Sequence, residues 1–289
     1  MGLTRIATVA AHFGRDLAFG RTRIAALIEE ARQAGAALLV LPDGALGGSL
    51  AGFGPADPDH LPPALAPDGP EVHEIAALAG NLVVCFGYTE AGENGARYTA
   101  AACVSGDGVL GRHRKVHLSA AEALLHLPGR GFTAFDTPAS RLGMLLDYDK
   151  AFPESARGLA ADGAGIVACL SSWATSSRSP TLARDRQARL FDVYDCVRAA
   201  ENQVVFVSAN QAGVMHGTRF FGQAKIVAPN GDTRARTGSR PALVVAELDV
   251  EAELATARRA RDHLGELRPL ATAAAHPQRS MANQGRPLA

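Results

Sequence analysis

The sequence has no excess charge of either sign and no long apolar run. Its 29 Lys+Arg balance its 29 Asp+Glu, whereas a nucleic-acid-binding protein normally carries a strong basic excess. No apolar stretch approaches the roughly 20 residues that cross a bilayer. The first residues, from Met1 to Ile6, also lack the apolar region of a signal peptide. We therefore expect no nucleic-acid partner, no membrane partner and a cytoplasmic location.

Cysteines are few and show no metal-binding or redox pattern. The four are Cys85, Cys103, Cys169 and Cys196, each within an apolar run and none in a CxxC pair. We interpret them as buried reduced thiols of a cytoplasmic protein. Cys169 lies near the end of an expected strand, where a displaced reactive thiol is the alternative to a core position.

Two histidines, His113 and His117, flank Lys115 at alternate positions, which on one strand would place all three side chains on the same face. A metal centre would need a third close ligand with compatible spacing, and none is evident in the sequence. We therefore expect no metal and no cofactor.

What the chain does have is an alternation of apolar strands with helical patterns over most of its 289 residues, of which 47% are hydrophobic. Strands are expected at 5–11, 37–41, 82–88, 98–104, 142–146, 165–170, 204–209, 224–227 and 243–248, and helices at 21–35, 70–79, 153–163, 181–202 and 250–261. This pattern predicts a layered α/β fold of sheets flanked by helices. We expect one domain over residues 1–265 and a tail or dimer arm over 266–289.

Ionisable residues gather in three segments that follow expected strands, where parallel α/β sheets collect functional groups. The first, residues 39–44, reads LVLPDG and holds Asp43. The second, residues 111–118, reads GRHRKVHL and holds Lys115. The third, residues 142–154, reads LGMLLDYDKAFPE and holds Asp147.

In their order and spacing these segments resemble the nitrilase superfamily, also called carbon–nitrogen hydrolases, from about Leu3 to Leu248. The resemblance implies an α-β-β-α sandwich that pairs into an αββα–αββα dimer or a higher homo-oligomer. It also implies a small-molecule substrate or ligand and a Glu–Lys–Cys triad. Lys115 stands at the lysine position, but Asp43 replaces the glutamate and Asp147 replaces the nucleophilic cysteine.

These replacements change the chemistry that the family site could perform. A thiol forms an acyl adduct that water can cleave, whereas a carboxylate would form a mixed anhydride and expel amide nitrogen poorly. Asp147 is then a nucleophile for an unusual substrate, a general base for water, or a structural member of an ion-pair cluster. We expect a hydrolase of carbon–nitrogen or related acyl substrates with altered chemistry. The alternative is a catalytically inactive relative that binds a ligand or partner.

Five further residues are candidates for supporting or substrate-binding roles: Glu122, Tyr148, Asp149, Glu154 and Trp173. Glu122 stands where many family members place a second glutamate, although a surface carboxylate fits the local sequence equally well. Asp149 and Glu154 belong to the third segment and are expected to orient its turn and the following helix start. Trp173, the single tryptophan, is expected to line the pocket or the dimer seam. The arginines of 181–202, among them Arg198, are expected on a solvated or subunit-facing side.

Overall fold

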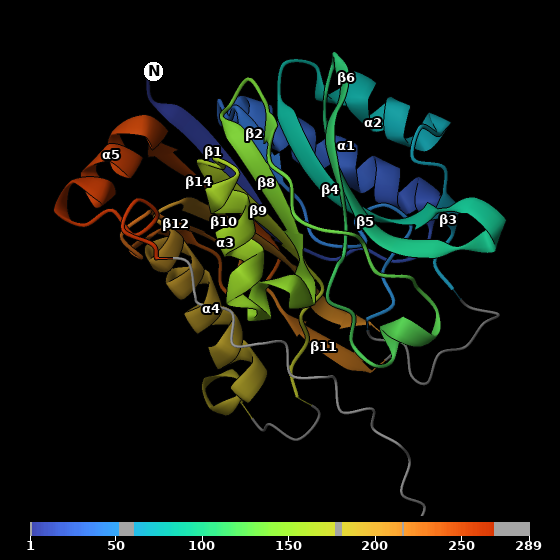
Figure 1. The fold of residues 1–289 in the computed structure, drawn as a ribbon. Coiled ribbons are helices and arrows are strands. Elements are labelled where there is room, and N and C mark those ends of the chain that lie inside the picture. Colours follow the sequence, from blue (N-terminus) through green and yellow to red (C-terminus); the bar gives the residue numbers. More distant parts are fainter. Residues whose placement is uncertain (1, 52–60, 177–180, 216, 269–289) are drawn as a thin grey trace, which may run out of the picture.

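The computed structural model describes residues 2–51, 61–176, 181–215 and 217–268. A continuous path of strands runs in the order β6-β5-β4-β2-β1-β10-β9-β8-β7 (Figure 1). The strands of this path are β1 (Thr4–Ala11), β2 (Leu38–Val40), β4 (Val83–Ala91), β5 (Arg97–Ser105), β6 (Gly108–Arg114), β7 (Phe135–Asp136), β8 (Arg141–Leu146), β9 (Ile166–Ser171) and β10 (Val205–Met215). Five strands pair beside it: β3 (Ala64–Leu65), β11 (Thr218–Phe221), β12 (Lys225–Val227), β13 (Thr233–Arg236) and β14 (Ala242–Leu248).

The path divides into two sheets at the junction of β1 and β10. These strands pair only through Ala10 with Asn210 and Ala11 with Gln211, so they diverge over the rest of their length. The two sheets then pack face to face around a core that includes Val40, Cys85 and Leu170. Apolar residues from both sheets alternate into this layer, because successive side chains of a strand point to opposite faces.

Helices cover the two outer faces (Figure 1). Helices α1 (Leu17–Gln33) and α2 (Pro70–Ala79) bury Ile24 and Ile75 against the sheet of β1, β2, β4 and β5. Helices α3 (Pro153–Ala161) and α4 (Arg186–Asn202) bury Leu159 and Ala199 against the sheet of β8, β9 and β10. The resulting order of layers is α-β-β-α, as the sequence predicted.

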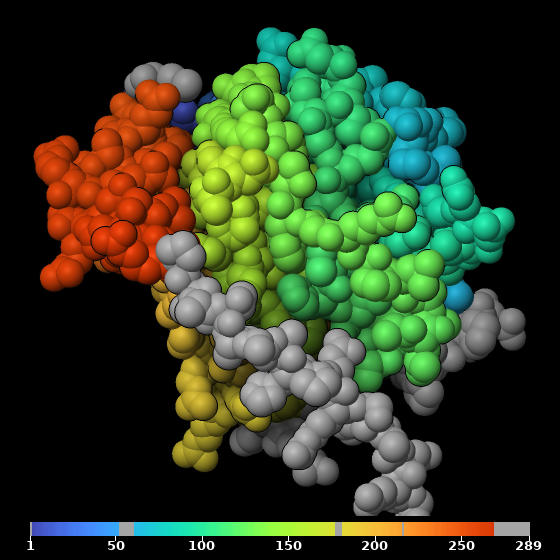
Figure 2. Space-filling view, viewed as in Figure 1, coloured from blue at the N-terminus to red at the C-terminus, as the bar shows by residue number. Residues whose placement is uncertain are grey.

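The last helix of the described residues, α5 (Val250–Ala260), lies at the edge of the molecule. Figure 2 shows this orange-red region at one side of the visible face and the green to teal β4–β6 region at the other. No helix within the described residues is long and apolar enough to cross a membrane. Most of the expected tail, residues 269–289, lies outside the described residues.

Two helix starts differ from the sequence expectation because aspartates cap them. Helix α1 begins at Leu17, four residues before the expected start, since the Asp16 carboxylate accepts hydrogen bonds from the amides of Ala18 and Phe19. Helix α4 begins at Arg186, not at residue 181, since Asp185 caps its first turn. A separate 3-10 turn over Leu182–Arg184 precedes that cap.

Candidate active site

The three segments singled out in the sequence meet at one end of the sandwich. Asp43 follows β2, Asp147 follows β8, and Lys115 follows β6. Strand β2 runs parallel to its neighbours in one sheet, and β8 and β9 run parallel in the other. The carboxyl ends of these strands therefore lie at the same end of the sandwich. The topology therefore gathers two carboxylates and an ammonium group that are far apart in the sequence.

Lys115 is the centre of this cluster and only 1% exposed. Its Nζ donates to Glu122 Oε1 at 2.5 Å and lies 3.4 Å from Asp147 Oδ2. Burial alone would lower the pKa of Lys115, but the carboxylates of Asp147, Glu122 and Asp43 raise it above its ordinary value. The lysine therefore keeps its positive charge at all physiological pH values.

Glu122 reaches the cluster from a 3-10 turn over Glu122–Leu124. Its second oxygen, Oε2, accepts a hydrogen bond from the Ser119 amide at 2.8 Å. Burial would raise the pKa of Glu122, but the interactions with Lys115 and Ser119 lower it. The structure thus brings Glu122 into direct contact with Lys115 as an ionised carboxylate.

Asp147 opens a 3-10 turn, Asp147–Ala151, which we call the elbow. Its φ of 48° lies in the left-handed region, which aspartate tolerates better than most residues. The carboxylate points back to the site, where Oδ1 accepts a hydrogen bond from the Ser172 amide at 3.2 Å. Burial raises the pKa of Asp147, while Lys115 and Lys150 oppose that rise.

Asp43 is 4% exposed and is held through its backbone. Its carbonyl oxygen accepts from Ser172 Oγ and from Gln211 Nε2, both at 3.0 Å. A Cβ on Gly87 would lie 2.6 Å from the Asp43 Cα, so only glycine allows β4 to approach this closely. Burial, reinforced by the nearby charge of Asp147, raises the pKa of Asp43 to about 7.

Asp149 ties the elbow to the lysine segment. Its Oδ1 accepts hydrogen bonds from the amides of Val116 and His117, and its Oδ2 accepts from His113 Nε2 and the Leu146 amide. The residue is fully buried, and these donors, with the His117 ring, hold its pKa well below the usual range despite burial. Asp149 therefore fixes the position of Asp147 relative to Lys115.

This bridge corrects the expected geometry of the two histidines. Strand β6 ends at Arg114, so Lys115 and His117 lie beyond it and do not share a strand face with His113. Both histidine rings turn to Asp149, and His117 stacks on Phe152 with ring centroids 3.8 Å apart. Within the described residues, no group of three His, Cys, Asp or Glu side chains could hold a metal ion.

The other predicted residues lie around the cluster at different depths. Tyr148 is 40% exposed and packs edge-on against Phe152. Trp173 is half-buried, with Nε1 donating to Gln187 Oε1 and its amide donating to Asn210 Oδ1. Glu154 is exposed to solvent in the first turn of α3.

Three of the four thiols lie in the interior of the fold, whereas Cys196 on α4 is half-buried, contrary to the expectation that all four are buried. Cys169 is fully buried on β9 in the core beneath α3 and α4, and burial raises its pKa to about 12. Cys85 and Cys103 face each other across β4 and β5 in the core between the sheets. Cys169 is therefore a core thiol, and its burial and raised pKa argue against the alternative of a displaced reactive thiol.

The sequence interpretation missed three groups that shape the site: Ser172, Gln211 and Lys150. Ser172 contacts both Asp43 and Asp147, and its position directly after β9 was the available signal. Gln211 contacts Asp43 from within β10, where no strand-end signal marks it. Lys150 lies within the third segment but is fully buried, not solvated. Arg198 corrects the expectation for α4, because it is 4% exposed and donates to the carbonyl oxygens of Lys150 and Ala151.

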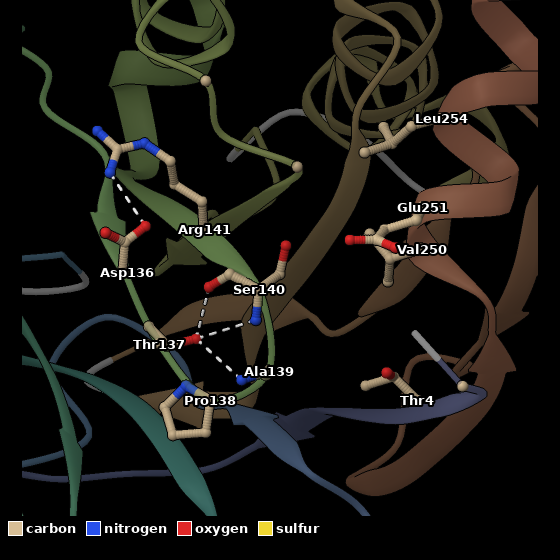
Figure 3. A pocket seen from close by; sticks show the side chains of 13 residues that line it. Thr4, Asp136, Thr137, Pro138, Ala139, Ser140, Arg141, Val250, Glu251 and Leu254 are labelled. Atoms are coloured by element: carbon tan, nitrogen blue, oxygen red, sulfur yellow. Dashed lines mark hydrogen bonds and ion pairs between the residues drawn. The ribbon is translucent and has the colours of Figure 1, made fainter.

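A separate cavity of about 370 Å³ lies at the other end of the sandwich (Figure 3). Thr4 and Arg141, the first residues of β1 and β8, line it together with Val250 and Glu251 of α5. Arg141 pairs there with Asp136 (Figure 3). None of the residues predicted for the active site lines this cavity.

The fold is an α-β-β-α sandwich with a buried lysine and acidic residues where its strands end. Residues 5–258 match the Carbon-nitrogen hydrolase family, and the chain belongs to it. A hydrolase from Pseudomonas protegens (in the pqqF 5' region) is 31% identical over 71% of this chain and 70% of its own length. An (R)-stereoselective amidase from Pseudomonas sp. is 31% identical over 65% of each chain.

The fold is shared with a carbon–nitrogen hydrolase from Helicobacter pylori, whose crystal structure superposes with a TM-score of 0.83. That alignment covers 92% of this chain and 96% of the other, at 22% identity. The architecture is therefore that of the family over nearly its whole length.

Proposed function

We propose that this chain is a carbon–nitrogen hydrolase that works without a thiol, through proton transfers by Asp43 and Asp147 beside Lys115. Its substrate class is a small molecule with an amide or related acyl–nitrogen bond. The amidase among its relatives supports this class. Asp147 stands where the family's nucleophilic cysteine would be, so the proposed chemistry replaces covalent catalysis with activation of water.

The observation that carries this proposal is the raised pKa of the buried Asp43 carboxyl. This pKa is about 7, so protonated and ionised forms are both populated at neutral pH. A group of this kind is suited to general acid–base catalysis, which is most efficient when the pKa lies near the working pH. Two nearby carboxyls with different proton affinities can divide the roles of acid and base.

In the proposed reaction, ionised Asp147 takes a proton from water while the water oxygen bonds to the acyl carbon. The carbon–nitrogen bond then breaks as protonated Asp43 gives its proton to the leaving nitrogen. The proton on Asp147 passes to Asp43, and both groups return to their starting states. Lys115 offsets part of the negative charge of the carboxylates throughout, since three of them contribute to its raised pKa.

A second candidate function is ligand binding without turnover. The Asp147 carboxylate contacts both Lys115 Nζ and the Ser172 amide, two donors that would suit the oxyanion of an acyl intermediate. Because the Asp147 carboxylate already occupies both donors, they are not free to stabilise an oxyanion. This favours a site that holds a ligand without hydrolysing it. The contacts are long, 3.4 and 3.2 Å, whereas Glu122 holds Lys115 at 2.5 Å. Asp147 is thus the more loosely held carboxylate, which favours the hydrolase.

Substitution of either carboxylate tests the proposed function. On a substrate found by ammonia release from a panel of small amides and nitriles, D147N is expected to lower kcat about 100-fold, the contribution of one acid or base. The wild-type rate should fall with rising pH around a midpoint near 7, as Asp43 loses its proton. D43N should remove that alkaline limb. Binding of panel members without turnover, at any pH from about 5 to 9, would favour the second candidate.

The Asp43 pKa can also be tested through stability, independently of turnover. Because its folded-state pKa of about 7 exceeds its unfolded value of 3.8, the folded state binds the proton more tightly. This group therefore favours folding at low pH and loses that contribution as pH rises from about 4 to 7. In urea denaturation, D43N should be more stable relative to wild type at pH 8 than at pH 5. An equal difference at both pH values would contradict the assignment.

A further inference from the structure

Lysine is rare in this chain and is confined to the interior. Among 29 Lys+Arg there are only three lysines, Lys115, Lys150 and Lys225. They are 1%, 0% and 0% exposed, respectively. Arginine supplies the other basic side chains. A compact ammonium group thus occurs only at buried positions, where its small size and its ability to titrate distinguish it from a guanidinium.

Lys150 belongs to the elbow, three residues after Asp147, and lies beneath the site. Its Nζ donates to Asp195 Oδ1 at 2.8 Å and lies 3.1 Å from the centroid of the Phe191 ring. Asp195, on α4, is also fully buried, and its Oδ2 lies 3.1 Å from Lys225 Nζ. Lys225 in turn pairs with Asp192 at 2.8 Å. The Arg236 guanidinium also lies 3.5 Å from Asp192, so two ammonium groups, a guanidinium and two carboxylates form one network.

Helix α4 holds the elbow through this network and through the backbone. Asp195 binds the Lys150 side chain, and Arg198 donates to the carbonyl oxygens of Lys150 and Ala151 at 2.9 and 3.1 Å. These three contacts fix the later half of the elbow, while Asp149 fixes the earlier half onto the lysine segment. A left-handed residue such as Asp147 persists where its surroundings constrain it in this way.

We propose that Lys150 is a positioning residue for Asp147: its buried ammonium, held by Asp195, anchors the elbow to α4 and supplies a second positive charge at the site. The inference rests on the proposed function, in which Asp147 is the base that takes a proton from water. The tests below measure titration midpoints and not turnover. A negative result in them can therefore be distinguished from a failure of the proposed function.

The charged and titratable groups that face Lys150 come from several elements. Asp195 approaches from α4, Cys169 from β9 and Lys225 from β12. Burial lowers the pKa of Lys150, and Asp195 opposes that effect. Burial and the charge of Glu122 raise the pKa of Asp147, whereas the positive charges of Lys115 and Lys150 lower it. Removing Lys150 should therefore make an acid at position 147 weaker.

A thiol at position 147 provides the probe. In D147C, the pH dependence of alkylation by iodoacetamide reports the thiol pKa, and the wild type gives the background from its four native cysteines. In D147C/K150M the midpoint should rise by about one pH unit or more, since a nearby positive charge has been removed. The control D147C/K225M removes a lysine from the same network and should leave the midpoint within about 0.3 units. A folded D147C/K150M with an unchanged midpoint, or an equal rise in the control, would overturn the proposal.

Nuclear magnetic resonance supplies a second test that leaves Lys150 in place. Protein labelled with carbon-13 at the lysine Cε has three lysine signals, one for each lysine of the sequence. Because the coupling between two titrating groups is reciprocal, losing the Asp147 charge in D147N should lower the titration midpoint of the Lys150 signal. The Lys225 signal should stay unchanged. A Lys150 midpoint that is the same in D147N and wild type would refute the coupling, even if K150M fails to fold.

Discussion

The double variant D43E/D147C is expected to hydrolyse small amides through a covalent thioester, which the natural side chains cannot form. The rate of ammonia release should be about 1000-fold higher than in D43E/D147A. Removing the nucleophile from a catalytic unit costs nearly as much rate as removing the whole unit. Mass spectrometry should detect, during turnover, an acyl group bound to the thiol introduced at position 147.

The surrounding geometry supports this expectation. The elbow already presents residue 147 with a left-handed φ of 48°, next to Lys115 and the Ser172 amide. With a neutral thiol in place of the carboxylate, both donors become available to the oxyanion of the intermediate. Glutamate at position 43 has the longer acidic side chain that the resemblance to the family implies for this position.

The single variants separate the two contributions. D147C alone should form the acyl-enzyme more slowly, since Asp43 is one methylene shorter than glutamate, and D43E alone should show no thioester. A folded D43E/D147C that forms no acyl-enzyme with any amide or nitrile in the panel would contradict this prediction. The site would then differ from a thiol hydrolase in more than its two acidic replacements.

Substitution of Asp149 by asparagine is expected to destabilise the fold by about 3–5 kcal/mol, the usual cost of breaking a buried charged network from one side. Three backbone amides and the ring of His113 donate to the fully buried carboxylate, and an amide group cannot accept from all of them. Urea denaturation at neutral pH measures the loss.

The pH dependence of this loss has a defined sign. The folded-state pKa of Asp149 lies below its unfolded value, so its ionised form contributes stability above about pH 4 and less as the pH falls further. The difference between wild type and D149N should therefore shrink in acid. E154Q is the matched control: Glu154 is an exposed carboxylate in the same segment, and its substitution should change stability by less than about 0.5 kcal/mol. Equal effects of D149N and E154Q would contradict the bridging role of Asp149.

Local sequence signals predicted most elements of the fold but not all of their ends. The aspartates at 16 and 185 are good helix caps, yet apolar periodicity alone placed the starts of α1 and α4 several residues away from them. Arg198 was expected on a solvated or subunit-facing side of its helix, because it is one of several arginines within 181–202. In the fold it donates to two backbone carbonyls of the elbow and is almost completely buried.

The sequence by itself predicted the family and the layered architecture, which the family match and the fold confirm, and it singled out Asp43, Lys115 and Asp147 as candidate site residues, because motif order and strand-end positions can be read along the chain. Only the tertiary structure decided which groups surround them. Burial of Asp43 raises its pKa to about 7, Asp149 joins the elbow to the distant lysine segment, and Asp195 meets Lys150 from another helix. Desolvation and charge pairing act through space, so these properties arise only where the chain packs.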